Sequence, residues 1–173
     1  MVNIKLVPPP PQDDTVVPED HVGAAAHAIC YPGVSSCITI TGVQAGGLVG
    51  AHLTFATTSD ELDQFLEKLE AVGAGACQTF YVVGAITRFK ASTAVKAFNT
   101  RKKIRDRITG DFNKTATVWF CDTTPLGDNH IFAVINGMGA DFSSYPTAGN
   151  LVKWYEYPAY AGAGIAAASF VLR

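Results

Sequence analysis

Cysteine and histidine are scarce in this sequence and are not arranged as metal ligands. Its four cysteines, Cys30, Cys37, Cys77 and Cys121, are few for a disulfide-built domain of 173 residues, and no two of them form a Cys-x-x-Cys pair. The four histidines lack a ligand spacing such as His-Glu-x-x-His. The sequence therefore predicts no metal site and no cofactor.

Charge is also sparse, and long apolar runs are absent. Charged residues make up 16% of the chain and the net charge is −2, which gives no general attraction to nucleic acid or to a membrane surface. No stretch reaches the roughly 18 apolar residues that cross a bilayer. The opening Met-Val-Asn-Ile-Lys-Leu-Val lacks the basic head and the cleavage site of a secretory signal. We expect no nucleic-acid partner, no membrane partner and no cleavable signal peptide.

Apolar residues, by contrast, make up 48% of the chain, which is typical of a folded protein with a sizeable core. Four consecutive prolines and an acidic run occupy part of residues 1–20. Such a composition predicts a Pro-rich, acidic N-terminal arm that acts as a solvated connector. Residues 21–173 are then expected to form a single domain.

Apolar periodicity predicts one clear helix over residues 59–72, with Ser59 as its cap and two acidic residues in its first turn. A second helix is expected from residue 92 or 93 to about 108. The polar face of that second helix carries six cations, Lys96, Arg101, Lys102, Lys103, Arg105 and Arg107. A solvated face and a docking surface for an acidic partner are both open interpretations of these charges.

Strands are predicted where β-branched and aromatic residues cluster, over residues 22–29, 78–85, 115–122, 131–136, 151–157 and 165–172. Residues 2–7 read as a strand or an ordered arm. Residues 137–150 are rich in Gly and Ser and predict a long loop, a common location of substrate contacts. The predicted strands outnumber the predicted helices, and many of these strands are too apolar for one face to be exposed to solvent. We therefore expect an α+β fold, a mixed β-sandwich core flanked by helices.

The stretch from Cys30 to Phe55 holds the candidate site. Pro32 and Gly33 predict a turn, Cys37 begins an alternating strand, and Gly46-Gly47 reverses the chain into a second strand that carries His52. Neighbouring strands lie about 5 Å apart, so the thiol and the imidazole can meet. A Cys and a His in hydrogen-bond contact are the minimum for an activated thiolate nucleophile.

The Gly-x-Ser-Ser-Cys segment that ends at Cys37, followed fifteen residues later by His52, resembles the CheD chemoreceptor glutamine deamidases. It is similar too to the catalytic domain of the cytotoxic necrotizing factors and to the Burkholderia lethal factor. The resemblance covers residues 25–60. It implies an α+β deamidase fold and a bacterial hydrolase without a cofactor, in which Cys37 attacks a glutamine side chain of a protein substrate and His52 is the base and then the acid.

The backbone N–H groups of Ser36 and Cys37 are the expected donors to the oxyanion. In the families that this chain resembles, a Thr six residues before the Cys, or a backbone carbonyl, orients the His. Here that position is Tyr31, so the Tyr31 hydroxyl or a backbone carbonyl near residue 30 or 31 is the candidate third member. Thr39 and Thr54 are further candidates. The structural alternative is that Cys37 is a buried thiol at the start of a strand and His52 a capped strand histidine. A further alternative is a disulfide between Cys30 and Cys37, which would silence the thiol.

The choice of target and of reaction is open. Asp122 to His130 stands where a CheD protein has a Gly-Gly-x-x-Gly-Arg run, which favours a toxin- or effector-like enzyme of virulence over a chemotaxis enzyme. Such a protein acts in the bacterial cytoplasm or after delivery into a host cell. Transglutamination and peptide hydrolysis use the same groups. An alternative function of a different class is a catalytically silent binding module, which would bind its partner through the basic helix 92–108 and residues 137–150.

Overall fold

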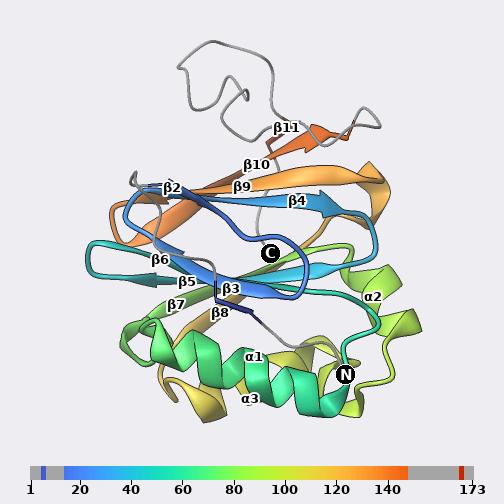
Figure 1. The fold of residues 1–173 in the computed structure, drawn as a ribbon, viewed down its shortest axis with the longest axis horizontal. Coiled ribbons are helices and arrows are strands. Elements are labelled where there is room, and N and C mark those ends of the chain that lie inside the picture. The colour runs from blue at the N-terminus through green and yellow to red at the C-terminus, as the bar shows by residue number, and fades with distance from the viewer. Residues whose placement is uncertain (1–4, 7–13, 148–167, 170–173) are drawn as a thin grey trace.

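Two mixed β-sheets lie face to face in the computed structural model, which describes residues 5–6, 14–147 and 168–169 (Figure 1). The first has the strand order β1-β3-β6-β5-β7-β8. Its members are β1 (Lys5–Leu6), β3 (His21–Ala25), β5 (Ile38–Gln44), β6 (Gly47–Leu53), β7 (Thr79–Gly84) and β8 (Thr117–Asp122). The pairs β1–β3 and β7–β8 are parallel, and the other pairs of this sheet are antiparallel.

The second sheet has the order β11-β10-β9-β4-β2. It consists of β2 (Asp14–Val16), β4 (Ala28–Val34), β9 (Asn129–Asn136), β10 (Gly139–Pro146) and β11 (Ala168–Ser169). Only the β2–β4 pair is parallel. The chain passes from this sheet to the first sheet twice, between β2 and β3 and between β4 and β5. The candidate site lies where these two crossings meet.

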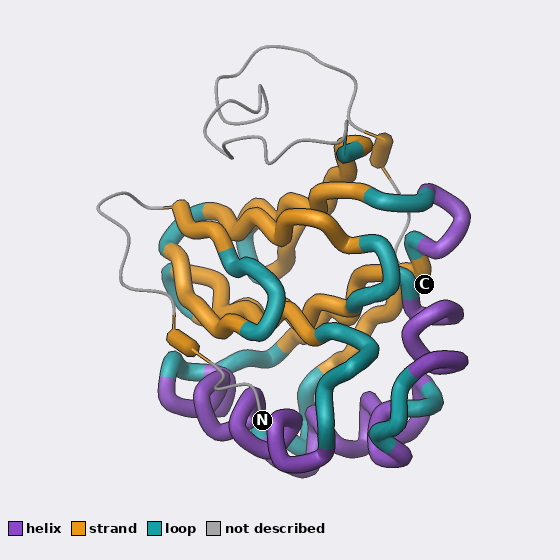
Figure 2. Tube along the Cα trace, turned by 45° about the vertical axis from the view of Figure 1, so that its right-hand side comes forward, coloured by secondary structure: helices purple, strands orange, loops and turns teal. Residues whose placement is uncertain are grey.

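Helices cover the outer face of the six-stranded sheet (Figure 2). Helix α1 (Ser59–Ala71) and helix α3 (Arg101–Asp111) pack there, and α2 (Ile86–Ser92) follows the end of β7. Short 3₁₀ turns occur at Ala74–Ala76, Lys96–Phe98 and Thr124–Leu126. The expectation of an α+β fold with two packed mixed sheets and helices outside is therefore confirmed for the described residues.

The β5–β6 hairpin agrees with the sequence prediction. Ile38 pairs with Leu53 and Gln44 pairs with Gly47, so the turn lies at the predicted glycines. Along β5, the even-numbered Ile38 and Ile40 face the helices, and the odd-numbered Thr41 faces the second sheet. This alternation directs the side chains of one strand face into the space between the sheets.

Helix α1 also agrees with the prediction, apart from its first residue. Thr58 is the N-cap, and its side chain accepts a hydrogen bond from the Glu61 backbone N–H, while the Glu61 carboxylate accepts one from the Thr58 N–H. This reciprocal pair is a capping box. Ser59 is therefore the first helical residue and not the cap.

The second predicted helix is wrong in its extent. Residues 92–108 divide into the end of α2, the turn Lys96–Phe98 and α3, which begins at Arg101 after the cap Thr100. The Thr100 side chain accepts a hydrogen bond from the Lys103 N–H, so this cap starts a new helix.

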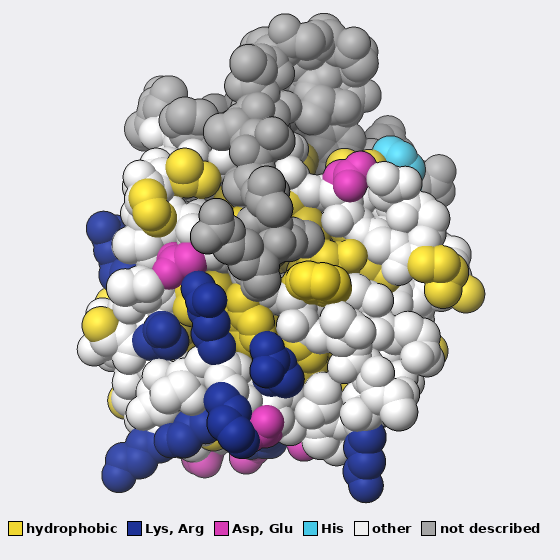
Figure 3. All heavy atoms as spheres, turned by 180° about the vertical axis from the view of Figure 1, so that it is seen from behind, with side chains coloured by type: hydrophobic (Ala, Val, Ile, Leu, Met, Phe, Trp, Pro, Cys, Tyr) yellow, Lys and Arg dark blue, Asp and Glu magenta, His cyan; other side chains and the backbone are white. Residues whose placement is uncertain are grey.

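Lysine and arginine side chains gather on the lower part of the rear face of the molecule (Figure 3).

Other strand predictions differ in their limits. The predicted strand 22–29 is two strands, β3 and β4, and β4 continues through Pro32 and Gly33 with an irregular register there. Residues 139–146 form β10 and not a loop, because they pair with β9 along their whole length. Residues 151–157 and most of 165–172 lie outside the described residues.

The N-terminal segment also differs from the predicted connector. Asp14–Val16 pair with β4, and Val17 is fully buried between the sheets. Parallel pairing of β2 with β4 draws this segment into the second sheet. The part of the chain before residue 14, except Lys5–Leu6 of β1, lies outside the described residues.

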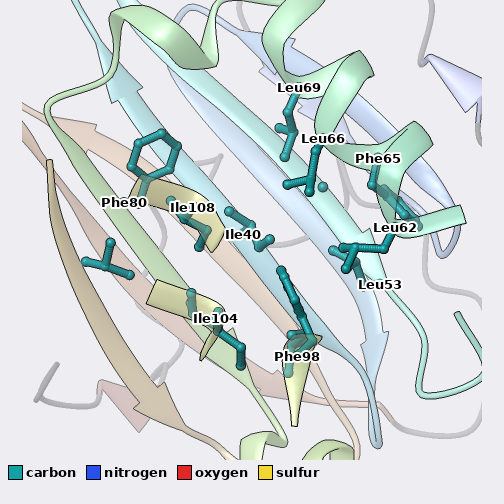
Figure 4. Packing of buried hydrophobic residues seen from close by; sticks show 14 of the residues in the cluster. Ile40, Leu53, Leu62, Phe65, Leu66, Leu69, Phe80, Phe98, Ile104 and Ile108 are labelled. Atoms are coloured by element: carbon teal, nitrogen blue, oxygen red, sulfur yellow. The ribbon is translucent and has the colours of Figure 1, made fainter. Parts of the chain in front are cut away.

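Two hydrophobic cores result from this layering. The first lies between the helices and the six-stranded sheet, where α1, α3 and the strands contribute fully buried side chains (Figure 4). The labelled members are Ile40, Leu53, Leu62, Phe65, Leu66, Leu69, Phe80, Phe98, Ile104 and Ile108. Each such Leu, Ile or Phe contributes roughly 1.5–3 kcal/mol by burial. The second core lies between the sheets and includes Ile29, Val83 and Phe142.

Within the described residues, every helix is too short or too polar to cross a membrane.

Candidate functional site

Cys37 and His52 come together as the hairpin register requires. His52 pairs with Thr39, so Cys37, two residues earlier, is the diagonal neighbour of His52 on the same face of the sheet. That face is turned toward the second sheet. Cys37 has 2% of its surface exposed and His52 has none. The predicted nucleophile and base are therefore adjacent and buried at one end of the space between the sheets.

The end of β7 fixes the position of Cys37. The Ala85 N–H donates a hydrogen bond to the Cys37 carbonyl at 3.0 Å. Gly84 has φ +150°, and a Cβ there would lie 2.5 Å from the same carbonyl oxygen. Arg88 of α2 donates to the Ser35 carbonyl at 2.9 Å. The approach to Cys37 is thus held by one backbone contact, which a side chain at position 84 would disturb, and by the Arg88 guanidinium.

His52 is oriented by a backbone carbonyl. Its Nδ1 lies 3.2 Å from the carbonyl oxygen of Val17. A carbonyl only accepts, so Nδ1 carries the proton and Nε2 is the unprotonated nitrogen. Nε2 is buried and has no hydrogen-bond partner among the described residues. The imidazole therefore has an unprotonated and unpaired nitrogen in a buried position.

Glu19 joins Cys37 and His52 from the crossing between β2 and β3. The Cys37 thiol donates a hydrogen bond to Glu19 Oε1 at 3.1 Å. A carboxylate oxygen of Glu19, Sγ of Cys37 and a ring nitrogen of His52 lie within 4.8 Å of one another. Glu19 itself is exposed, so it stands between the buried pair and solvent.

These surroundings keep both groups neutral. Burial raises the pKa of Cys37, and the hydrogen bond and charge of Glu19 raise it further, to about 12. Burial lowers the pKa of His52 to about 4, although Glu19 and the Val17 carbonyl act in the opposite direction. The sequence predicted an activated thiolate. The surroundings of Cys37 instead favour the S–H form, first because the sulfur is buried and then because the Glu19 carboxylate accepts the thiol proton and places a negative charge beside it.

The Tyr31 hydroxyl does not orient His52. It shares a hydrogen bond with Thr41 Oγ1 at 2.7 Å, and only the ring of Tyr31 approaches His52, edge-on at 6.0 Å between centroids. The Thr39 hydroxyl donates to the Val83 carbonyl at 2.8 Å. The carbonyl that does orient His52 belongs to Val17 and not to residue 30 or 31. A backbone carbonyl is nevertheless one of the two kinds of third member that the resemblance implies.

Ser36 lies at the bend before Cys37. Hydrogen bonds from its backbone and side chain to Cys37 lower the pKa of the thiol, but burial raises that pKa by more. Thr54 follows β6, and its carbonyl accepts from the Thr57 N–H. Cys30 and Cys37 are both free thiols, so the disulfide alternative is wrong for this structure.

Glu19 and Val17 are the two site residues that sequence reasoning missed. Both lie in the segment interpreted as a solvated connector, and no spacing relates them to Cys37 or His52. One signal was present in the sequence: the two apolar valines before Pro18 interrupt an otherwise acidic run. They suggest a buried strand, and the acid that follows then lies at the end of that strand.

Neither a model of a known protein family nor a curated protein matches this chain.

Proposed function

We propose that this protein is a Cys–His-dependent amidohydrolase that deamidates a glutamine side chain of a target protein, with the deamidase-like fold that the resemblance implies. The observation that carries the proposal is the position of His52. Its Nδ1 donates a hydrogen bond to the Val17 carbonyl and its Nε2 is unprotonated and unpaired, while a ring nitrogen of His52, Cys37 Sγ and a Glu19 carboxylate oxygen lie within 4.8 Å of one another. Nucleophile, base and orienting acceptor are the three parts of a thiol acyl-transfer site.

The chemistry follows from these groups. Cys37 Sγ attacks the amide carbon while its proton passes to His52 Nε2, because no thiolate is preformed. The backbone N–H groups of Ser36 and Cys37 are the proposed donors to the tetrahedral oxyanion. His52 then gives the proton to the departing nitrogen, and ammonia leaves a thioester. Water, deprotonated by His52, releases glutamate and restores the thiol.

Glu19 has to leave the sulfur before Cys37 can attack a substrate. The thiol proton is held by its carboxylate, and Cys37 is 2% exposed. The crossing segment is a short turn: Asp20 has φ +61°, and its N–H donates to the His52 carbonyl at 3.0 Å. A positive φ at a non-glycine residue is a strained conformation. We propose that the bound substrate displaces Glu19 and relieves this turn.

The test is the intact mass of candidate target proteins after incubation with the full chain. Conversion of glutamine to glutamate adds about 1 Da and releases ammonia, because –NH₂ becomes –OH. Cys37→Ser and His52→Ala are expected to abolish both signals, a loss of at least about a thousandfold. Cys77→Ser is the matched control, since Cys77 is another buried free thiol, remote from this cluster. Full activity in Cys37→Ser would overturn the proposal.

The binding module of the basic helix has weaker support. Lys102 pairs with Asp106, and Arg107 pairs with Asp63 and Asp111. Lys103 donates to the Lys96 carbonyl and to Asn99. Several of these cations therefore already have hydrogen-bond or ion-pair partners within the molecule. Charge reversal at Lys102 and Lys103 separates the two functions, because it would remove partner binding and leave deamidation unchanged.

A further inference from the structure

The cluster of Glu19, Cys37 and His52 offers three different metal-ligand atoms at one point. A carboxylate oxygen, a sulfur and a ring nitrogen lie within 4.8 Å of one another. They come from three segments, namely the β2–β3 crossing, the residue before β5, and β6. We propose that this cluster binds a zinc-class divalent cation, which occupies the thiol and blocks its reaction with electrophiles.

The ligand atoms lie close to the spacing that tetrahedral zinc requires. Bonds of about 2.1 Å to nitrogen or oxygen and about 2.3 Å to sulfur place tetrahedral ligand atoms roughly 3.4–3.6 Å apart. Cys37 Sγ and Glu19 Oε1 are 3.1 Å apart, and the other ligand pairs are within 4.8 Å. Glu19 is exposed, so its side chain is free to rotate toward a bound metal, and a small shift of the Cys37 and His52 side chains closes any remaining gap between those two ligands.

The second observation is the unused nitrogen of His52. Nε2 is buried in a fully buried residue and has no hydrogen-bond partner among the described residues. Leaving such an acceptor unpaired is destabilising, because it has lost its hydration without gaining a partner. Its other nitrogen donates to the Val17 carbonyl, which is the usual outer contact of a metal-binding histidine. This contact leaves the lone pair of Nε2 as the one that a metal can bind.

The donor set selects the class of metal. Sulfur and imidazole ligands favour zinc and its neighbours over Mg²⁺ or Ca²⁺, which take oxygen ligands. Three protein ligands leave the fourth tetrahedral position to water. On binding, a metal–sulfur bond replaces the S–H bond of Cys37, and the proton goes to solvent. No change of oxidation state is involved.

Metal binding does not rest on the proposed deamidation, although it uses the same sulfur. The experiment therefore reads the metal directly. The full chain, freed of metal with a chelator, is titrated with Co²⁺, and the thiolate-to-cobalt charge-transfer band is followed. We expect one equivalent to bind and Zn²⁺ to displace it. Cys37→Ser should lose the band, Glu19→Gln should weaken binding roughly tenfold or more, and Cys77→Ser should match the unaltered chain.

A second readout is alkylation of Cys37 by iodoacetamide, located by peptide mass spectrometry. One equivalent of Zn²⁺ should suppress alkylation of Cys37, and a chelator should restore it. The absence of a band, or a band that persists in Cys37→Ser, overturns the metal site. A band in a chain that deamidates no target would instead support the metal site and count against the proposed function.

Discussion

At the scale of single residues, the protonation of Cys37 depends on burial and then on its contact with Glu19. Burial alone disfavours a thiolate, because a charge loses its hydration there. The Glu19 carboxylate adds a hydrogen-bond acceptor for the thiol proton and a negative charge beside the sulfur. The same residue is exposed and lies in a turn rather than in a strand, so its contact with Cys37 is the part of the site that is most easily broken.

Glu19→Gln is expected to lower the pKa of Cys37, although burial still holds it above its ordinary value. A fall of half a pKa unit already raises the thiolate fraction about threefold. The rate of Cys37 alkylation by iodoacetamide, measured with a chelator present, should rise by at least that factor. Glu67→Gln, an exposed acid on α1, is the control and should leave the rate unchanged. An equal rate in Glu19→Gln would show that Glu19 does not hold the proton.

At the scale of elements, Asp122 links the end of β8 to the start of α2. Its Oδ2 accepts from the Thr87 N–H at 3.1 Å and from the Thr87 hydroxyl, and its Oδ1 accepts from the Thr124 N–H at 3.0 Å. Burial raises the pKa of Asp122, but the hydrogen bonds from Thr124 and Thr87 outweigh it, and the net pKa is lowered. This carboxylate therefore stabilises the helix that carries Arg88 to the Cys37 approach.

Asp122→Ala is expected to reduce the free energy of unfolding by about 1 kcal/mol, because three or more hydrogen bonds to a half-buried carboxylate are lost. The folded pKa is depressed, so the stabilisation is present above the unfolded pKa of about 4 and is lost as the pH falls through the folded value. Urea denaturation at neutral and at acidic pH measures the free energy of unfolding of both chains.

The difference between Asp122→Ala and the unaltered chain should shrink in acid. Glu67→Ala, on the exposed face of α1, should change stability by less than about 0.5 kcal/mol at either pH. If the difference in unfolding free energy is the same at neutral and at acidic pH, the charge of Asp122 does not contribute to stability.

The elements that sequence predicted well are those whose signals are local. Helix α1 has its cap, capping box and apolar stripe within one segment, and the β5–β6 hairpin has its turn and alternation within another. The helix expected over 92–108 failed for a local reason too, because the cap at Thr100 is hidden in a basic, polar run. Strand β10 failed because Gly and Ser favour a loop, whereas pairing with β9 determines its conformation.

At the scale of the whole molecule, the two sheets meet at Tyr31. Its hydroxyl crosses from β4 to Thr41 of β5, and the strand partner of Thr41 is Gly50. A Cβ at Gly50 would lie 2.1 Å from the Tyr31 hydroxyl and 3.0 Å from Ile29 Cδ1. Tyr31 is fully buried and cannot move aside freely. The absence of a side chain at position 50 therefore sets how closely the sheets approach.

Gly50→Ala is expected to lower the free energy of unfolding by roughly 1–3 kcal/mol, because overpacking forces the buried Tyr31 ring to shift. Thermal or urea denaturation measures the loss. Gly110→Ala is the matched control: it lies in α3 with open space around its Cβ position, and it should stabilise the protein by about 0.5–1 kcal/mol through helix propensity. If Gly50→Ala is as stable as the unaltered chain, the sheets are not held at this distance by the contact.

The sequence by itself determined that Cys37 and His52 lie on the same face of neighbouring strands, because His52 follows Cys37 by fifteen positions with a glycine turn between them, and such a hairpin has a fixed alternation. Only the tertiary structure decided what surrounds that pair. Val17 and Glu19 reach it because β2 pairs with β4 in the other sheet and the chain then crosses over. Such pairing depends on contacts between distant segments, and no local pattern encodes which carbonyl or carboxylate will meet a given imidazole or thiol.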